Sequence, residues 1–268
     1  MLAVGGSMAA NGATKITQEN VPLTSSEFSE QSGGAITCAD TQTDIAYTNG
    51  DDFSLAFWFK ITTDQTGTMM KDYEIVQWGK NQSGGFQVTV NDESGDDEHI
   101  MIRMFQGTGT SLQSYDDTTN LAHDTWYHCA IVFDYSEQTL VFYIDGEQSS
   151  SHSSVQRPTT TDALQKICVG FAMGASGFDG WLNNLVMWDN VALTADEIAQ
   201  VYNGGNSCDV TKIRESELLF CFPLDSRDVV ATVNDYGPHS ATAAGQSNLS
   251  NGDFAKTETS KNTIISLG

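Results

Sequence analysis

Apolar and polar positions alternate with a period of two through the middle of the chain, and this period is typical of β-strands that bury one face. Residues 53–61 (FSLAFWFKI) are the clearest case, because every odd position from Phe53 to Ile61 is large and apolar. The even positions carry Ser, Ala, Trp and Lys, so the opposite face of this strand is mixed. Shorter runs of the same kind predict strands at residues 74–78, 85–90, 100–105, 166–171 and 178–188.

Two further runs predict a β-hairpin. Residues 125–133 (TWYHCAIVF) and 139–144 (TLVFYI) are separated by residues 134–138, and the dipeptide Asp145-Gly146 follows the second run. Asp-Gly tolerates positive φ angles and therefore favours a tight turn. Because strands recur while helical patterns are rare, the sequence predicts an all-β fold of antiparallel sheets packed as a sandwich.

One short helix is expected near residues 194–203. Thr194 and Glu197 have the spacing of a capping box, in which each side chain bonds the other residue's backbone N–H group. An apolar stripe at i, i+3 and i+4 starts at Ile198, and Asn203-Gly204-Gly205 follows as a left-handed stop signal. We expect this helix to be structural.

The chain divides into three parts by pattern. Residues 1–33 are rich in Ser, Thr, Gly and Gln and indicate an arm or a loosely packed edge. Residues 34–205 contain the strand signals and form the expected sandwich. Residues 206–268 are a C-terminal extension, in which residues 218–224 (LLFCFPL) predict one more strand of the sandwich. Pro223 favours an edge position for that strand.

Charge and cysteine content narrow the functional classes. The chain has 35 acidic and 12 basic residues and a formal net charge of −23, which disfavours binding to nucleic acid or anionic membranes. No export signal and no membrane-spanning run of apolar residues is recognised. The five cysteines lack CxxC spacing, so a zinc site is not indicated. Cys129 and Cys168 lie in apolar strand patterns, and whether Cys208 and Cys221 pair is left open.

Four segments together resemble the laminin-G-like, concanavalin A-like jelly-roll family, whose relatives include legume lectins and pentraxins. They are residues 53–61 (FSLAFWFKI), 124–132 (DTWYHCAIV), 139–146 (TLVFYIDG) and 178–205 (FDGWLNNLVMWDNVALTADEIAQVYNGG). The resemblance implies a two-sheet jelly roll. Asn184 stands roughly where many relatives carry Asp, so a metal site of the family is not assumed at this position.

Residues 218–245 (LLFCFPLDSRDVVATVNDYGPHSATAAG) resemble a phrase found after jelly rolls of tailed, especially marine, bacteriophages. The resemblance implies a virion structural protein, either a capsid decoration protein or a tail accessory protein, that contacts other virion proteins and is assembled in the host cytoplasm. The absence of a coiled-coil or β-helical shaft pattern favours the capsid. The alternative is a lectin module, with or without calcium, that binds cell-surface glycans. The oligomeric state is left open.

The resemblance also requires a test for enzymatic residues, because related β-glucanases carry E-x-D-x-E or E-x-D-x-x-E on one strand. The nearest pattern runs from Glu93 to Glu98, but its spacing differs and Gly95 indicates a loop. No G-x-S-x-G, H-x-H or HExxH motif occurs. His128 lies within a strand pattern beside Trp126 and is interpreted as structural. We therefore expect no catalytic residue, no cofactor and no enzymatic activity.

Two sets of residues remain as binding candidates. The acidic loop after residue 90 offers oxygen ligands for Ca²⁺ but fits no defined calcium loop, and the alternative is a solvated hairpin loop. The tryptophans could stack on sugars, or they could fill the core and line an interface. Asp179 is interpreted as a turn residue. The acidic candidates are Asp92, Glu93, Asp96, Asp97 and Glu98, and the aromatic candidates are Trp58, Trp78, Trp126, Trp181 and Trp188.

Overall fold

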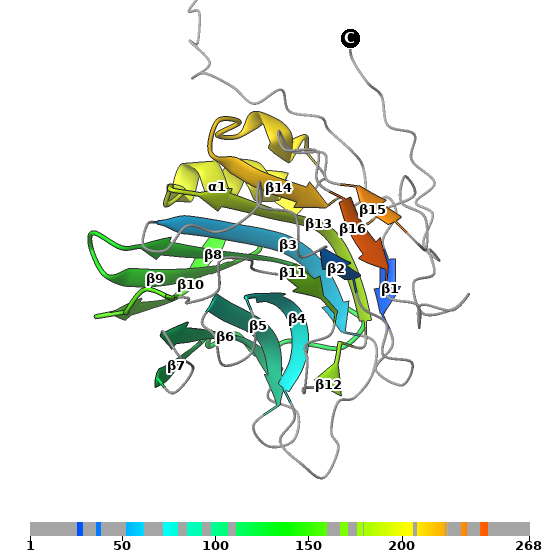
Figure 1. Cartoon of the computed structure of the whole chain (residues 1–268), viewed down its shortest axis with the longest axis horizontal. Helices are drawn as coiled ribbons and strands as arrows, with labels where there is room; N and C mark the ends of the chain where they lie inside the picture. Colours follow the sequence, from blue (N-terminus) through cyan, green and yellow to red (C-terminus); the bar gives the residue numbers. More distant parts are fainter. Residues whose placement is uncertain are drawn as a thin grey trace, which may run out of the picture.

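The chain folds into two β-sheets packed face to face, with one short α-helix against the outer side of one sheet (Figure 1). The fold was obtained as a computed structural model. It describes residues 26–28, 36–38, 52–61, 72–79, 85–92, 98–106, 111–159, 167–170, 176–178, 180–205, 208–222, 224, 232–234 and 242–245. The all-β sandwich expected from the alternating pattern is confirmed.

Sheet A has seven strands in the order β1-β13-β3-β8-β9-β10, and β14 also pairs with β13. All of these pairs are antiparallel. Its strands are β1 (Ser26–Phe28), β3 (Phe53–Ile61), β8 (Trp126–Asp134), β9 (Thr139–Ile144), β10 (Glu147–Ser153), β13 (Gly180–Asp189) and β14 (Leu218–Phe222).

Sheet B has nine strands, eight of them in the order β15-β16-β2-β11-β4-β5-β6-β7. The ninth, β12, pairs with β4 in parallel, whereas the other pairs are antiparallel. Its strands are β2 (Ile36–Cys38), β4 (Asp72–Trp78), β5 (Gly85–Asp92), β6 (Glu98–Gln106), β7 (Ser111–Asp116), β11 (Ile167–Val169), β12 (Ser176–Gly177), β15 (Thr232–Asn234) and β16 (Thr242–Gly245).

The main core lies between the two sheets and is rich in aromatic rings. Every odd position of β3 from Phe53 to Ile61 is buried in it, as the period of two predicts. Phe53 of sheet A stacks on Phe86 of sheet B with 5.1 Å between ring centroids, and Trp78 stacks on Phe220 at 6.0 Å. Each fully buried side chain of this size contributes about 1.5–3 kcal/mol of transfer free energy.

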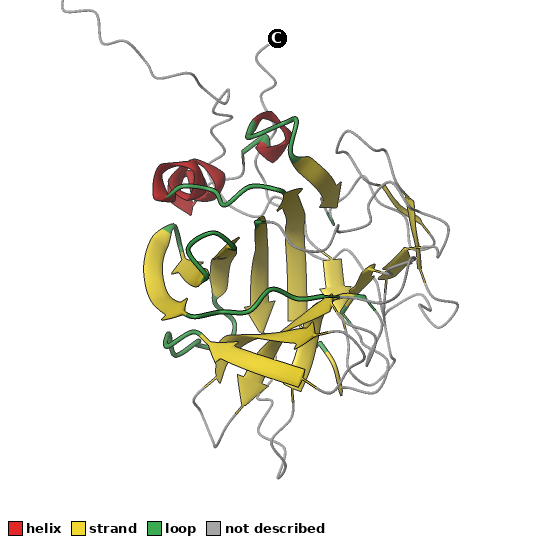
Figure 2. Ribbon diagram, turned by 60° about the vertical axis from the view of Figure 1, so that its left-hand side comes forward, coloured by secondary structure: helices red, strands yellow, loops and turns green. Residues whose placement is uncertain are grey.

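A second core lies between the outer face of sheet A and helix α1 (Ala195–Tyr202) (Figure 2). The capping box forms as predicted, because Thr194 Oγ1 accepts from Glu197 N and the Glu197 carboxylate accepts from Thr194 N. Asn203, at φ 51°, ends the helix in the left-handed region. The apolar stripe of α1 packs Ile198 and Val201 over Ala56.

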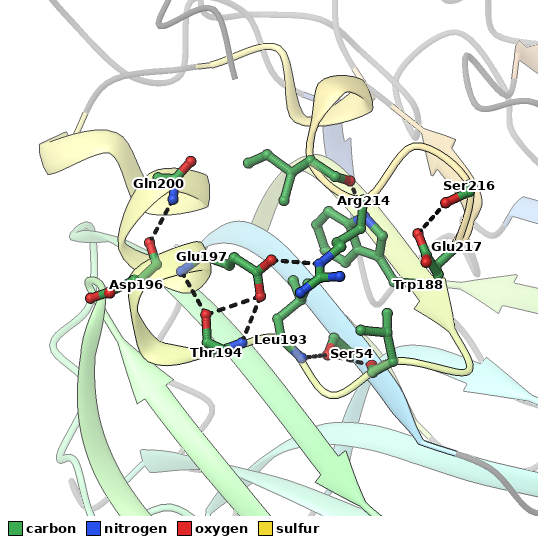
Figure 3. Close-up of polar contacts among 12 residues, drawn as sticks. Ser54, Trp188, Leu193, Thr194, Asp196, Glu197, Gln200, Arg214, Ser216 and Glu217 are labelled. Atoms are coloured by element: carbon green, nitrogen blue, oxygen red, sulfur yellow. Dashed lines mark hydrogen bonds and ion pairs between the residues drawn. The ribbon is translucent and has the colours of Figure 1, made fainter. Parts of the chain in front are cut away.

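Polar contacts tie α1 and the segment before β14 to sheet A (Figure 3). Arg214 Nε donates to Glu197 Oε1 at 2.5 Å, and Trp188 Nε1 donates to the backbone oxygen of Ile213 at 2.6 Å. The segment also contains two short 3-10 turns, η3 (Asn203–Gly205) and η4 (Val210–Lys212). These contacts join part of the expected C-terminal extension to the sandwich.

Several predicted boundaries differ from the structure. Residues 26–28, expected in an arm or loose edge, form the edge strand β1, and the strand expected at residues 218–224 is β14. The turn expected at Asp145-Gly146 forms with φ angles of 50° and 80°. Cys208 and Cys221 form no disulfide with each other. Within the described residues, no helix has both the length and the apolar character that a bilayer span requires.

Candidate functional site

The outer face of sheet A is aromatic and mostly closed. Trp188 is buried in the second core and donates to the backbone oxygen of Ile213, whereas Trp78 belongs to the main core instead. Trp58 lies beneath Tyr202 of α1, with 5.7 Å between ring centroids and an interplanar angle of 30°. At the far end of the same face, Lys60 Nζ lies 5.1 Å from the ring of Trp181 and 5.3 Å from that of Trp126. In these cation–π contacts the rings of Trp126 and Trp181 pack against the side chain of Lys60 in the same sheet.

His128 lies within this aromatic face and is buried. Its ring centroid is 5.1 Å from that of Trp58 and 5.8 Å from that of Tyr202. Burial lowers the pKa of His128 to about 3, so the imidazole is neutral. Burial also raises the pKa of the neighbouring Cys129 thiol, which is a core side chain.

The outer face of sheet B has the opposite character. Alternate residues of β4, β5 and β6 enter the main core, so the intervening residues face outward. A β-bulge between Glu74 and Val76 turns both Ile75 and Val76 toward the core and returns Gln77 to the outer side. We call this surface the polar face, made of Glu74, Gln77, Gln87, Thr89, Asn91, His99, Met101, Arg103, Ser114 and Asp116.

Strand register aligns these residues in rows across sheet B. The first row is Gln77, Gln87, Arg103 and Ser114, one residue from each of β4 to β7. The second row is Glu74, Thr89, Met101 and Asp116. Directly opposite residues on neighbouring strands have Cβ atoms about 4.5–5.5 Å apart. Exposed polar groups that are neighbours in a row can therefore contact one ligand together.

Exposure increases across the polar face from β4 to β7. Glu74 is 0 % exposed and accepts a hydrogen bond from Gln87 Nε2 at 3.1 Å, whereas Arg103 is half-buried and Ser114 is exposed. Near one end, His99 Nε2 lies 3.4 Å from Asn91 Nδ2 and 3.6 Å from Asp116 Oδ1. The part accessible to a ligand is thus the half formed by β6 and β7.

Thr89 adds an unpartnered hydroxyl to the centre of the polar face. The residue is 1 % exposed, and its Oγ1 has no hydrogen-bond partner in the described part of the chain. An unmade hydrogen bond of a buried polar group costs about 1–3 kcal/mol. A threonine at this position is therefore not explained by packing alone.

The described carboxylates of the polar face are too far apart for glycoside hydrolysis. Glu74 and Asp116 stand at the two ends of one row, three strand spacings or about 14 Å apart. Retaining and inverting glycosidases place their carboxyl groups about 5–5.5 Å and about 6.5–9.5 Å apart. The rows can donate and accept hydrogen bonds, but this pair cannot act together on one glycosidic bond.

The acidic loop proposed for calcium is only partly described. Residues 93–97 lie outside the described residues, and Asp92 ends β5. Glu98, expected in that loop, instead begins β6, because its pairing with Asp92 extends the ladder. Its buried carboxylate lies 2.7 Å from His123 Nε2. Among the described residues, no three His, Cys, Asp or Glu side chains form a group that could hold a metal ion.

Asn184 and Asp179 are the two other residues considered in the sequence. Asn184 has a φ of 46° and lies at a β-bulge of β13, where Asn is one of the residues that tolerate the left-handed region. Asp179 lies outside the described residues. The polar face itself was missed in the sequence, although the alternation in residues 85–92 and 98–106 contained its signal.

Comparison with known proteins agrees with the fold. The profile of a family described as the concanavalin A-like lectin/glucanases superfamily matches residues 31–199. A putative carbohydrate binding protein from Bacteroides ovatus has a similar structure, with a TM-score of 0.61 and 16 % identity over 94 % of this chain and 62 % of that chain. The present chain therefore spans less than two thirds of that protein's length.

A second similar structure is the CBM40 of a Ruminococcus gnavus IT-sialidase bound to α2,3-sialyllactose. Its TM-score is 0.51, with 14 % identity over 70 % of this chain and 99 % of that chain. At such identities the similarity shows the fold alone. No curated protein sequence matches the chain.

Proposed function

Because the chain belongs to the concanavalin A-like lectin/glucanase superfamily, we propose that it is a non-enzymatic module that binds cell-surface glycans through the polar face. The observation that carries this proposal is the set of polar side chains on the accessible part of this face, formed by His99 and Arg103 of β6 and by Ser114 and Asp116 of β7. Sugar hydroxyls both donate and accept hydrogen bonds, and these side chains supply both kinds of partner. The carbohydrate-binding structures with the same fold support the proposal.

The absence of catalysis is part of this proposal. It is supported by the separation of Glu74 from Asp116 and by the burial of His128, which keeps its ring away from a bound substrate. The virion role inferred from residues 218–245 finds no support in the similarities named above and stays a prediction. Calcium dependence also stays a prediction, since four of its five candidate ligands have no described side chain.

A glycan array tests the proposal when it is probed with two matched variants. Ser114→Trp places a bulky ring on the accessible half of the polar face, and Ser151→Trp places the same ring on β10 of sheet A. Both serines are exposed, so both variants should fold. We expect the unmodified chain and Ser151→Trp to bind the same glycans, and Ser114→Trp to lose about tenfold or more of the signal.

Two results would overturn the proposal. One is an array that stays blank both in calcium and in EDTA. The other is equal binding by the two variants, because the glycan would then bind away from the polar face. Release of reducing sugar from any bound glycan would contradict the non-enzymatic part.

A further inference from the structure

Strand β10 forms one edge of sheet A, and within the described part of the chain it pairs with β9 alone. It has seven residues, whereas the edge strands β1 and β15 have three each. An edge strand presents a row of unpaired backbone N–H and C=O groups, and proteins usually protect long edges with charges, proline or a bulge. The one carboxylate of β10, Glu147, and its bulge between Gln148 and Ser150 both lie at its start. The remainder of this edge has no such protection.

The strand register shows which backbone groups of β10 point outward. Asp145 N donates to the backbone oxygen of His128 on β8 at 2.8 Å. Antiparallel ladders alternate, so Val141, four residues earlier, also directs its backbone groups to β8. Ser151 is the residue of β10 opposite Val141, and its N–H and C=O groups therefore point away from sheet A. The same period applies to Ser153, two residues further along.

Side-chain contacts with sheet B hold β10 in place. Ser149 Oγ and Ser150 Oγ donate to Asp117 Oδ1 at 2.5 and 3.0 Å. His152 Nε2 lies 2.9 Å from the backbone oxygen of Asp116. These contacts join β10 to the end of β7. Because the edge is already ordered in the single chain, pairing with a partner costs little further conformational entropy.

Charge determines what kind of partner this edge can accept. The net charge of −23 makes two copies of the chain repel each other over most of their surfaces. β10 has no carboxylate after Glu147, so the repulsion is weaker along it. In an antiparallel pair of β10 strands centred on His152, the two Glu147 residues lie about ten residues, or about 34 Å, apart. This separation exceeds the Debye length of about 8 Å at physiological ionic strength, so these two charges do not oppose pairing.

We propose that the chain forms a two-fold dimer in which the β10 strands of two copies pair antiparallel and join both A sheets into one. Ser151 of each copy then lies opposite Ser153 of the other, so one segment supplies both sides, as a two-fold interface requires. The two-fold axis of an antiparallel pair is perpendicular to the sheet, so the outer faces of both B sheets point to the same side. Bivalent binding to a glycan-covered surface is the consequence, and this part rests on the proposed function.

Sedimentation velocity of the full chain, without any glycan, tests the dimer over a range of concentrations. A single pair of short strands makes a small interface, so we expect reversible dimerisation with a Kd in roughly the micromolar range. The mass should rise from that of one chain to that of two as the concentration increases.

Two matched variants assign the interface to β10. Ser151→Pro removes an outward N–H group, and proline is tolerated on the outer side of an edge strand. This variant should dimerise about tenfold or more weakly while its melting temperature stays unchanged. Ser151→Ala should leave the dimer intact, because side chains of β10 project from the faces of the sheet and not from its edge.

Hydrogen exchange gives a second test that needs no substitution. In the single chain, the outward amides of Ser151 and Ser153 bond only to water and should exchange fast. At concentrations where the dimer dominates, we expect their exchange to slow by about tenfold or more. The amide of His152, which points to β9, serves as the internal control and should change little.

Two results would overturn the dimer. One is a chain that stays monomeric from micromolar to millimolar concentration. The other is a dimer that Ser151→Pro does not weaken and that leaves the Ser151 and Ser153 amides unprotected, because its interface then lies elsewhere. Neither result affects glycan binding by a single chain, and a blank glycan array would leave the dimer in place. Equal signals from the unmodified chain and Ser151→Pro on a densely coated array would contradict the bivalent presentation alone.

Discussion

The outer faces of the two sheets are both formed by strands with alternating residues, yet the two faces differ in character. On sheet A, Trp188, Val186 and Ala56 are buried in a second apolar core together with residues of α1, η4 and β14. On sheet B, the equivalent positions of β4 to β7 are amides, hydroxyls and charges, with Arg103 at the centre. Since the inner faces of both sheets are apolar, the composition of the outer face decides whether its side chains form a second apolar core or polar rows, which are accessible to a ligand along β6 and β7.

The comparison predicts its largest effect for Trp188→Ala on sheet A. The indole is fully buried and donates to the Ile213 backbone, so its loss should reduce the free energy of unfolding by about 3–5 kcal/mol. Gln87→Ala on the polar face should cost less, about 1–3 kcal/mol, because it removes a donor from the buried Glu74 carboxylate. Urea denaturation of both variants measures the two values. Equal losses of unfolding free energy in the two variants would contradict the view that the outer face of sheet A contributes more to stability than the polar face.

A second prediction concerns acid stability and depends on His128. The unfolded chain protonates this histidine below about pH 6.5, whereas burial keeps the folded side chain neutral until about pH 3. Stability from this residue is therefore complete above pH 6.5 and is lost as the pH falls toward 3. The slope should approach about 1.4 kcal/mol per pH unit within that window. His128→Gln should flatten the measured curve, and an unchanged slope would refute the assignment.

Two isosteric Thr→Val substitutions test the comparison at stability changes of about 1 kcal/mol. Thr194→Val removes the N-cap hydroxyl of α1 and should destabilise the fold by about 1 kcal/mol. Thr89→Val removes the unpartnered hydroxyl of the polar face and should leave stability unchanged or higher. A stability loss in Thr89→Val as large as in Thr194→Val would mean that its hydroxyl has a structural partner.

The smallest expected effect is at the ion pair between Arg214 and Glu197. Burial alone would raise the pKa of Glu197, but hydrogen bonds from Arg214 and Thr194 outweigh it and lower the pKa. The pair therefore adds stability above about pH 4.5, and this is lost as the pH falls through the lowered pKa. Arg214→Gln should cost about 0.5 kcal/mol at pH 7 and less at pH 3, as thermal unfolding at the two pH values would show. A loss that is equal at both values would contradict the pairing.

Local patterns in the sequence are enough to predict most of the fold. The apolar odd positions of β3, the Asp145-Gly146 turn and the Thr194 capping box each depend on neighbours within a few residues, and the structure confirms them. The family profile likewise confirms the jelly-roll resemblance.

The candidate site could not be predicted in the same way, because it depends on register between separate strands. Arg103 and Gln87 become neighbours only when β5 pairs with β6, and Gln77 joins their row only because of the bulge after Glu74. Glu98 was interpreted as a loop residue, although the alternation Glu98-His99-Ile100 continues the strand. Its burial depends on the distant His123.

The most direct test of the central claim maps the bound glycan onto the two faces. Four of the five tryptophans lie on the outer face of sheet A and the fifth in the main core, so the polar face contains none. In a ¹H–¹⁵N NMR titration with a glycan identified on the array, we predict shifts in backbone amides of β6 and β7 around Ser114, with the five indole signals unmoved. Shifts of the Trp126 and Trp181 indoles, with sheet B unaffected, would contradict the account.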